Sequence, residues 1–430
     1  MNQVNPPGFR ELLDYPLVSA LLGRRSRRFG LGMEIPDGFF EHKSSHPPRP
    51  LSELETMLVI TACGGNTSWH HMLFRAAPYA PRLSNYSAGA GGRTFPSAAG
   101  FETSQTFFTD DSGVFVLDTR DAPAWAERGG DGGLDLEAML VAHRGRVRKL
   151  QDARLGVPCE PPFIEPHNTW VVNQPGTLLV IPVGDLAQHV LLALCYYLQN
   201  GVVFQDDVNR RPIPGLEAYR DLADVDHPMP LSFLEQWCLG ELTSELACSC
   251  YAGALLLQAM GLGGWVFNGM DPFAVLGASG DPRAPGLGFR FDTNERWPLP
   301  NPTGLAGVME GFCPPHHADM RAAVEAACER KFGPGGPFHP DTPGPWKDSP
   351  GVRRAAAVHD ERFRECVALQ AQYVYDTFGK FPGSAPSIFC LPYLQAFHLD
   401  TEFYDRFFNP GAYLDTHANH MERWHGDKRP

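Results

Sequence analysis

The sequence predicts an α+β fold, in which helices and short strands mix without the regular alternation of a doubly wound sheet. Three observations support this prediction. Apolar residues recur at helical spacing in some segments and alternate as in strands in others. The most apolar segment, residues 232–271, is typical of a long buried helix that ends at glycines and leads into a short strand. A hydrophobic fraction of 43% over 430 residues is enough for a substantial core.

The first 297 residues are expected to build the sheet. A short helix should lead into the basic segment 24–28, and Ser52 is placed to cap a helix over 50–65. An Asp-Asp-Ser-Gly turn should join two strands within 103–120. The next patterns predict an amphipathic helix, two strands joined by a turn, a helix with a glycine stop and a last strand, at residues 133–156, 169–184, 185–201 and 285–292.

The C-terminal part is expected to be mainly helical. Helical patterns at 316–333 and 360–379 flank a linker rich in proline and glycine. The proline-rich run at 298–303 indicates a boundary. We therefore expect one domain over 15–297 and a helical extension over 298–430.

Composition excludes several classes of protein. A net charge of −13 argues against nucleic acid as a partner. No segment approaches the roughly 20 apolar residues of a bilayer span, so no membrane is expected. The first residues lack a secretory signal, and the ten cysteines are scattered, as expected for reduced thiols in a cytoplasmic protein. Dinucleotide, Walker A, nucleophile-elbow and zincin motifs are absent from the sequence.

The basic segment 24–28 holds four arginines and one serine. Arg24, Ser26 and Arg28 alternate, and guanidinium groups with a hydroxyl between them can clamp a phosphate. The other two arginines are expected to face solvent. The alternative is a solvated basic helix end, which the helix dipole would favour.

Two segments of small residues follow along the chain. The loop around Pro96 and Ser97 would let backbone amides approach a flat ligand closely, although a small-residue loop before a strand needs no ligand. Residues 261–263, Gly-Leu-Gly, end the long apolar helix and precede an Asn-Gly loop. Alone, this second segment indicates only a buried helix with a glycine stop.

In this order, the three segments together resemble the nitroreductase family of FMN-dependent oxidoreductases. That family opens with Arg-x-Ser-x-Arg/Lys, carries a Pro-Ser-small segment before a strand, and ends a late apolar helix in Gly-Leu-Gly. The resemblance covers about residues 15–295, with insertions around 122–165 and 200–230. The segment 93–100 is closer to the SagB-like, azoline-oxidase branch. The matching residues are Arg24, Ser26, Arg28, Pro96, Ser97, Ala98, Gly261, Leu262, Gly263, Asn268 and Gly269.

The resemblance implies a central mixed sheet flanked by helices, and FMN as the cofactor. Arg24 and Ser26 would hold the phosphate and the ribityl chain, and Arg28 would lie near the pyrimidine edge of the ring. The backbone at Gly269 would approach the flavin N5. Arg290 is a candidate second phosphate partner, with an ordinary strand-edge arginine as the alternative.

The implied reaction is a ping-pong transfer of two electrons to or from a small organic substrate, with NAD(P)H as a candidate donor. Because the flavin does the chemistry, no catalytic acid or base is predicted. The family pattern also implies a homodimer whose subunits share each flavin site. The sequence departs from that pattern after Pro-Ser and in its C-terminal extension. The departures leave the substrate open, and they leave a redox-inactive binding module as a rival.

The segment 398–425 contains four histidines. His417 and His420 are spaced to face one metal ion from a helix, with His425, Glu402 or Glu422 completing the site. A metal-dependent enzyme is therefore a second rival. We favour a helix whose aromatic residues dock on the main domain, and so predict no metal.

Overall fold

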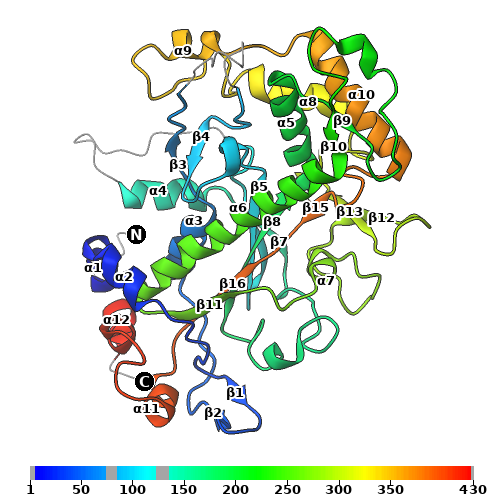
Figure 1. Cartoon of the computed structure of the whole chain (residues 1–430). Coiled ribbons are helices and arrows are strands. Elements are labelled where there is room, and N and C mark those ends of the chain that lie inside the picture. Colours follow the sequence, from blue (N-terminus) through cyan, green and yellow to red (C-terminus); the bar gives the residue numbers. More distant parts are fainter. Residues whose placement is uncertain (1–4, 74–84, 123–134, 428–430) are drawn as a thin grey trace.

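The computed structural model describes residues 5–73, 85–122 and 135–427. Its central sheet has seven strands in the order β11-β16-β8-β5-β6-β7, with β15 also paired to β8 (Figure 1). All of these pairings are antiparallel, so the expected mixed sheet is wrong on this point. The strands are β5 (Ser104–Asp110), β6 (Gly113–Leu117), β7 (Val147–Gln151), β8 (Leu178–Asp185), β11 (Gly263–Phe267), β15 (Ile388–Phe389) and β16 (Tyr393–Phe397).

Strand β8 runs through the middle of this sheet and is buried on both faces. Leu178 and Val180 pack toward one hydrophobic cluster, while Leu179, Ile181 and Val183 pack toward another. Successive side chains of a strand point to opposite faces. A strand covered on both sides therefore reads as a continuous apolar run, which is the pattern at 178–183.

Helix α6 (Leu231–Met260) has 30 residues and is about 45 Å long. It runs across the sheet (Figure 1), and its buried residues join two of the hydrophobic clusters. Gly261 ends it in the left-handed conformation, with φ of 82°. The expected long buried helix, its glycine stop and the strand β11 after it are therefore confirmed.

Helix α3 (Glu53–Gly64) begins with a capping box, in which Ser52 accepts from the Glu55 amide and Glu55 accepts from the Ser52 amide. This confirms the expected Ser52 cap. The other helices are α1 (Pro7–Asp14), α2 (Leu17–Gly23), α4 (Leu136–Arg144), α5 (Leu186–Gln199), α7 (Pro272–Leu276), α8 (Met320–Phe332), α9 (Ser349–Ala355), α10 (Glu361–Phe378), α11 (Thr401–Phe407) and α12 (Asp415–Ala418).

Short elements complete the fold. Three small pairings and one three-stranded sheet lie outside the central sheet. They are formed by β1 (Glu34–Ile35), β2 (His42–Lys43), β3 (Asn66–Trp69), β4 (Gly91–Arg93), β9 (Phe204–Gln205), β10 (Met229–Pro230), β12 (Arg290–Asp292), β13 (Asn301–Leu305) and β14 (Met309–Glu310). Single turns occur at η1 (Ala98–Gly100), η2 (Pro166–Asn168), η3 (Leu216–Tyr219) and η4 (Met421–His425), the last a π-helix.

The C-terminal segment contains the helices predicted at 316–333 and 360–379, as α8 and α10, but it is not a separate extension. Its strand β16 lies between β11 and β8 and pairs with both. Residues from both sides of position 298 share the largest hydrophobic clusters. The segment 298–430 therefore completes the central sheet and the core instead of forming a separate unit.

Two local expectations also fail. The helix expected over 133–156 stops at Arg144, and residues 147–151 form β7, paired with β6. The first strand expected in 169–184 is absent, and residues 169–173 form turns before β8. In both places the apolar residues fit more than one pattern, and packing against neighbouring elements decides which secondary structure forms. Part of the insertion expected around 122–165 lies outside the described residues.

The described helices include none with the length and apolar character needed to cross a membrane. All ten cysteines are free thiols, and eight of them are buried.

Candidate functional site

The basic segment follows α2 and runs beside β11. Arg24 is the C-cap of α2, and the Gly264 amide donates to the Arg27 carbonyl at 2.8 Å. Arg27 and Gly264 form an antiparallel bridge. The segment is therefore held in extended form against the end strand of the sheet, as alternating side chains require.

Arg27 is the buried arginine of this segment, with 3% of its surface exposed. Its guanidinium donates to the Gln258 side chain at 2.7 Å and to the Ala412 carbonyl at 2.9 Å. Burial lowers the pKa of Arg27, and the charges of Arg25 and Arg24 add to this effect. The sequence expectation that both intervening arginines face solvent holds for Arg25 and is wrong for Arg27, because the tail around Ala412 covers it.

Arg24, Arg25 and Arg28 carry charges without a carboxylate partner. Arg25 and Arg28 are exposed and Arg24 is half-buried. Within the described part of the chain, none of the three lies in ion-pair distance of an acidic side chain. In a chain with a net charge of −13, these three arginines form a local surface of positive charge, which is the kind of surface that attracts anions.

Two cavities meet at this surface and share Arg25 and Ser26. One, of about 350 Å³, lies over α6 and β11, and Arg24, Tyr251 and Trp265 help to line it. The other, of about 460 Å³, contains Arg28 and is lined by six aromatic side chains. Its rings come from Phe29, Phe40, Trp170, Phe403, Tyr404 and Phe408.

The Pro-Ser loop lies elsewhere on the same chain. Pro96, Ser97 and Ala98 line a third cavity, of about 570 Å³, against the N-terminal half of α6. Ser97 donates to the buried Glu245 carboxylate at 2.5 Å and accepts from the Glu102 amide at 2.9 Å. The structure therefore does not bring the Pro-Ser loop and the basic segment into one cavity of a single chain.

The remaining predicted residues do not line the two cavities at the basic segment. Asn268 is exposed after β11. Gly269 is buried, and an added Cβ would come within 2.4 Å of the side-chain nitrogen Nδ2 of Asn168. Arg290 lies on β12 and pairs with Glu310 at 2.6 Å, as in the strand-edge alternative.

Sequence reasoning missed a polar group beside the Pro-Ser loop. His70 lies 2.7 Å from one oxygen of the buried Glu102, and Arg93 lies 3.6 Å from the other. These residues line a fourth cavity, of about 430 Å³, together with Pro96 and Ser97. Glu102 has a positive φ of 48°, which is rare outside glycine. No sequence signal identifies such a position.

The C-terminal histidines form a cluster that differs from the predicted pair. His420 and His425 approach Glu55 of α3, and His398 joins them from the residue after β16. Burial would raise the pKa of the Glu55 carboxyl, but the three imidazoles hold it well below its usual range. His417 is buried nearby and accepts from the Leu414 amide instead.

The two glutamates proposed to complete a histidine site lie outside this cluster. Glu402 accepts from Ser45 and lies 3.3 Å from His46, and Glu422 is exposed on the π-turn. The aromatic docking that the sequence predicts is present in part. Phe403, Tyr404 and Trp424 are buried, whereas Phe408 is 46% exposed.

Comparisons with known proteins add little to this geometry. No family model matches the chain, and no curated protein matches it. Among solved structures, the chain is similar to the crystal structure of a "putative nitroreductase" from Ralstonia eutropha JMP134. The similarity covers 63% of this chain and 75% of that one, at 12% identity and a TM-score of 0.27. A similarity of this size carries no argument about function.

Proposed function

We propose that the protein is an FMN-dependent oxidoreductase of the nitroreductase-like type. The observation that carries this proposal is the basic segment. Among the described residues, Arg24, Arg25 and Arg28 have no acidic partner, and they lie with Ser26 where two cavities share residues, one of them lined by six aromatic side chains. FMN joins a phosphate dianion to a flat ring system, and this donor set with aromatic walls fits both parts.

The roles follow from where the side chains lie. Arg24 and Ser26 line the cavity over α6 and β11, and would hold the phosphate and the ribityl chain. Arg28 lines the aromatic cavity, and would place a positive charge beside the ring. Bound FMN would supply reversible transfer of two electrons. A cation at the ring favours its reduced, negatively charged form. Arg290 and Gly269 are left out of the proposed site, because Arg290 pairs with Glu310 and neither residue lines the two cavities.

The separation of the Pro-Ser loop from the basic segment favours a shared site in a homodimer. The two regions lie along one face of α6, where Phe233, Trp237 and Tyr251 are 39%, 51% and 43% exposed. Exposed aromatic residues along a long helix favour contact with a second subunit. Such a pairing would bring Pro96, Ser97 and Ala98 of one subunit toward the basic segment of the other.

The substrate is left as a small organic molecule, with NAD(P)H as the candidate electron donor. The free thiols agree with a reducing, cytoplasmic location. The rival of a redox-inactive binding module would keep the cavities without the electron transfer.

Titration of the purified protein with FMN tests the proposal. We expect binding seen as quenched flavin fluorescence, and bleaching of the oxidised flavin band when NAD(P)H is added. Arg24→Ala and Ser26→Ala should each weaken FMN binding by about tenfold or more, because each removes a bond to a charged group. Arg10→Ala, at an exposed arginine of α1 outside both cavities, is the control.

Three results would count against the proposal. A protein that binds no FMN would exclude the flavoenzyme. Binding that survives Arg24→Ala and Ser26→Ala unchanged would place the flavin elsewhere. Binding without reduction by any donor would favour the binding module.

A further inference from the structure

Four side chains of different segments converge behind the tail: Glu55, His398, His420 and His425. The Nε2 atoms of the three histidines lie 3.3, 2.8 and 3.1 Å from the same carboxylate oxygen, Oε1 of Glu55. One ligand atom from each residue lies within 4.8 Å of all the others. Three of the side chains are exposed by 3% or less, and His425 by 13%.

These spacings are close to those of a tetrahedral metal site. Zinc binds imidazole nitrogen and carboxylate oxygen at about 2.0–2.1 Å, so tetrahedral ligands lie about 3.3 Å from one another. The three distances from Oε1 lie at or slightly below that value. Three imidazoles and one carboxylate are also a donor set that zinc prefers.

The second nitrogen of each buried ring fixes where its proton lies. The Nδ1 atom of His398 is 3.0 Å from the Arg49 carbonyl, and that of His420 is 2.8 Å from the Met260 carbonyl. A carbonyl oxygen can only accept, so both Nδ1 atoms carry the hydrogen. In the neutral ring, Nε2 is then an acceptor that faces another acceptor, Oε1. Backbone partners of this kind orient metal-binding histidines in proteins.

His420 shows the conflict most clearly. Its Nε2 atom lies 2.8 Å from Oε1, yet it has no hydrogen-bond partner of acceptable geometry among the described residues. The atom is buried, so it cannot turn to water instead. A cation between the nitrogen and the carboxylate would satisfy both atoms.

The backbone presents the ligands from three directions. Glu55 uses Oε2 to accept from the Ser52 amide at 2.6 Å, which leaves Oε1 for the cluster. His420 and His425 flank the π-turn Met421–His425, whose i to i+5 hydrogen bonding brings residues five apart onto one face. In an α-helix, residues five apart would point in different directions.

We propose that Glu55, His398, His420 and His425 form a structural site for one divalent transition-metal ion, zinc by preference. All four positions are taken by protein side chains, three of them buried and His425 half-buried, which is the arrangement of a structural rather than a catalytic zinc site. This inference does not depend on flavin binding.

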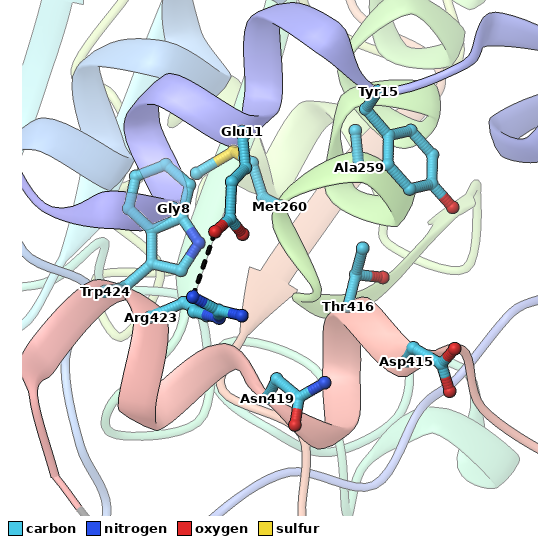
Figure 2. Close-up of a pocket in the computed structure, with 10 residues that line it drawn as sticks. All are labelled: Gly8, Glu11, Tyr15, Ala259, Met260, Asp415, Thr416, Asn419, Arg423 and Trp424. Atoms are coloured by element: carbon cyan, nitrogen blue, oxygen red, sulfur yellow. Dashed lines mark ion pairs between the residues drawn. The ribbon is translucent and has the colours of Figure 1, made fainter.

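The site would fasten the tail to the start of α3 and the end of β16. Figure 2 shows the tail side chains Thr416, Asn419, Arg423 and Trp424 against α1 and the end of α6. Arg423 pairs there with Glu11 at 3.0 Å. The His398 carbonyl also accepts from the Leu31 amide at 3.0 Å, so the site would support the chain just beyond the basic segment.

The experiment measures metal in the full-length protein, purified without a histidine tag and without added metal. Elemental analysis should find about one zinc ion per chain. After removal by a chelator, the melting temperature should fall, and added Zn²⁺ should restore it. Added Co²⁺ should give the intense visible band of tetrahedral cobalt. These readouts need no flavin, so their failure is separate from failure of the proposed enzyme activity.

Two substitutions test the ligands. His425→Ala removes the most exposed ligand, and Glu55→Gln keeps the size of the side chain and an acceptor for the Ser52 amide. Each should weaken metal binding by about tenfold or more. The matched control is His417→Leu, a buried histidine of the same tail outside the cluster, which should keep the metal.

The proposal is overturned if the wild-type chain holds no stoichiometric metal and gives no tetrahedral cobalt band. That result would leave three histidine side chains around the carboxylate with no ion between them. Equal metal binding by wild type, His425→Ala and Glu55→Gln would also overturn it. Should either variant fail to fold, the chelation and reconstitution of the wild-type chain decide the question alone.

Discussion

The basic segment and the Glu55–histidine cluster place their charged groups in opposite surroundings. At the basic segment, three arginines line cavities, and no acidic side chain in the described part of the chain pairs with them. In the cluster, one carboxylate oxygen faces three imidazoles, and the four side chains are exposed by 13% or less. An open set of like charges suits a ligand that carries the opposite charge and exchanges with solvent. A buried set of metal-ligand atoms suits a structural metal ion that stays bound.

The same comparison separates Arg27 from its neighbours. Arg27 is buried, like most of the histidine cluster. Its guanidinium donates hydrogen bonds to the tail, to α6 and to the end of α2. The tail therefore supports both regions, and changes that loosen it should affect them together. Three substitutions test this dependence.

The largest effect is expected for Gly261→Val. A Cβ at this position would come within 2.1 Å of the Thr416 carbonyl oxygen of the tail, and φ is +82°. Strain and overpacking together should lower the free energy of unfolding by about 4 kcal/mol. Denaturant unfolding followed by circular dichroism measures this.

Gly240→Ala is the control on the same helix. Nothing lies within 4 Å of a Cβ added there. Alanine in a helix interior should stabilise by about 0.5–1 kcal/mol relative to glycine. Similar losses for both variants would show that the tail contact at Gly261 is unimportant.

A smaller loss is expected for Arg27→Leu. It leaves the Ala412 carbonyl and the Gln258 side chain without the guanidinium donor, and should cost about 3 kcal/mol of unfolding free energy. Arg25→Leu, two residues earlier and exposed, should change stability by less than about 0.5 kcal/mol. Equal effects of the two substitutions in thermal unfolding would contradict the assignment of Arg27 as the buried, supporting arginine.

The smallest effect concerns pH. Burial, with the charge of Arg27 as the next contribution, lowers the pKa of His417 to about 3. Its usual pKa in an unfolded chain is about 6.5, so below that pH the unfolded state binds the extra proton. The stability linked to His417 is present above pH 6.5 and is lost as the pH falls toward 3.

Between pH 7 and pH 5, this loss amounts to about 2 kcal/mol. His417→Leu cannot take up the proton, so its stability should fall by about 2 kcal/mol less than that of wild type over the same interval. Parallel curves of unfolding free energy against pH for the two proteins would refute the shift.

Much of the local structure could be read from the sequence. The Ser52 cap, the Asp-Asp-Ser-Gly hairpin and the Gly261 stop depend on residues a few positions apart, and all three are present. The failures at β7 and before β8 concern short segments whose few apolar residues fit more than one pattern. Such a segment becomes a strand only where a neighbouring strand is placed to hydrogen-bond with it.

The candidate site divides in the same way. The alternation of Arg24, Ser26 and Arg28 marked the basic segment, but it could not show that Arg27 turns inward under Ala412, a contact between residues 385 positions apart. The histidine-rich tail was visible in the sequence. The fourth residue of the metal-site cluster, Glu55, gave no such signal in the sequence. It occupies an ordinary capping-box position and lies 343 positions from His398.

The sequence by itself determined the α+β class, the long helix α6 and the two chemically unusual segments, because periodicity, caps and composition act over short distances. Only the tertiary structure decided that β16 completes the central sheet, that the Pro-Ser loop lies apart from the basic segment, and that Glu55 meets three histidines. Those outcomes depend on how distant surfaces pack and pair, and packing depends on the summed burial of many side chains rather than on any local pattern.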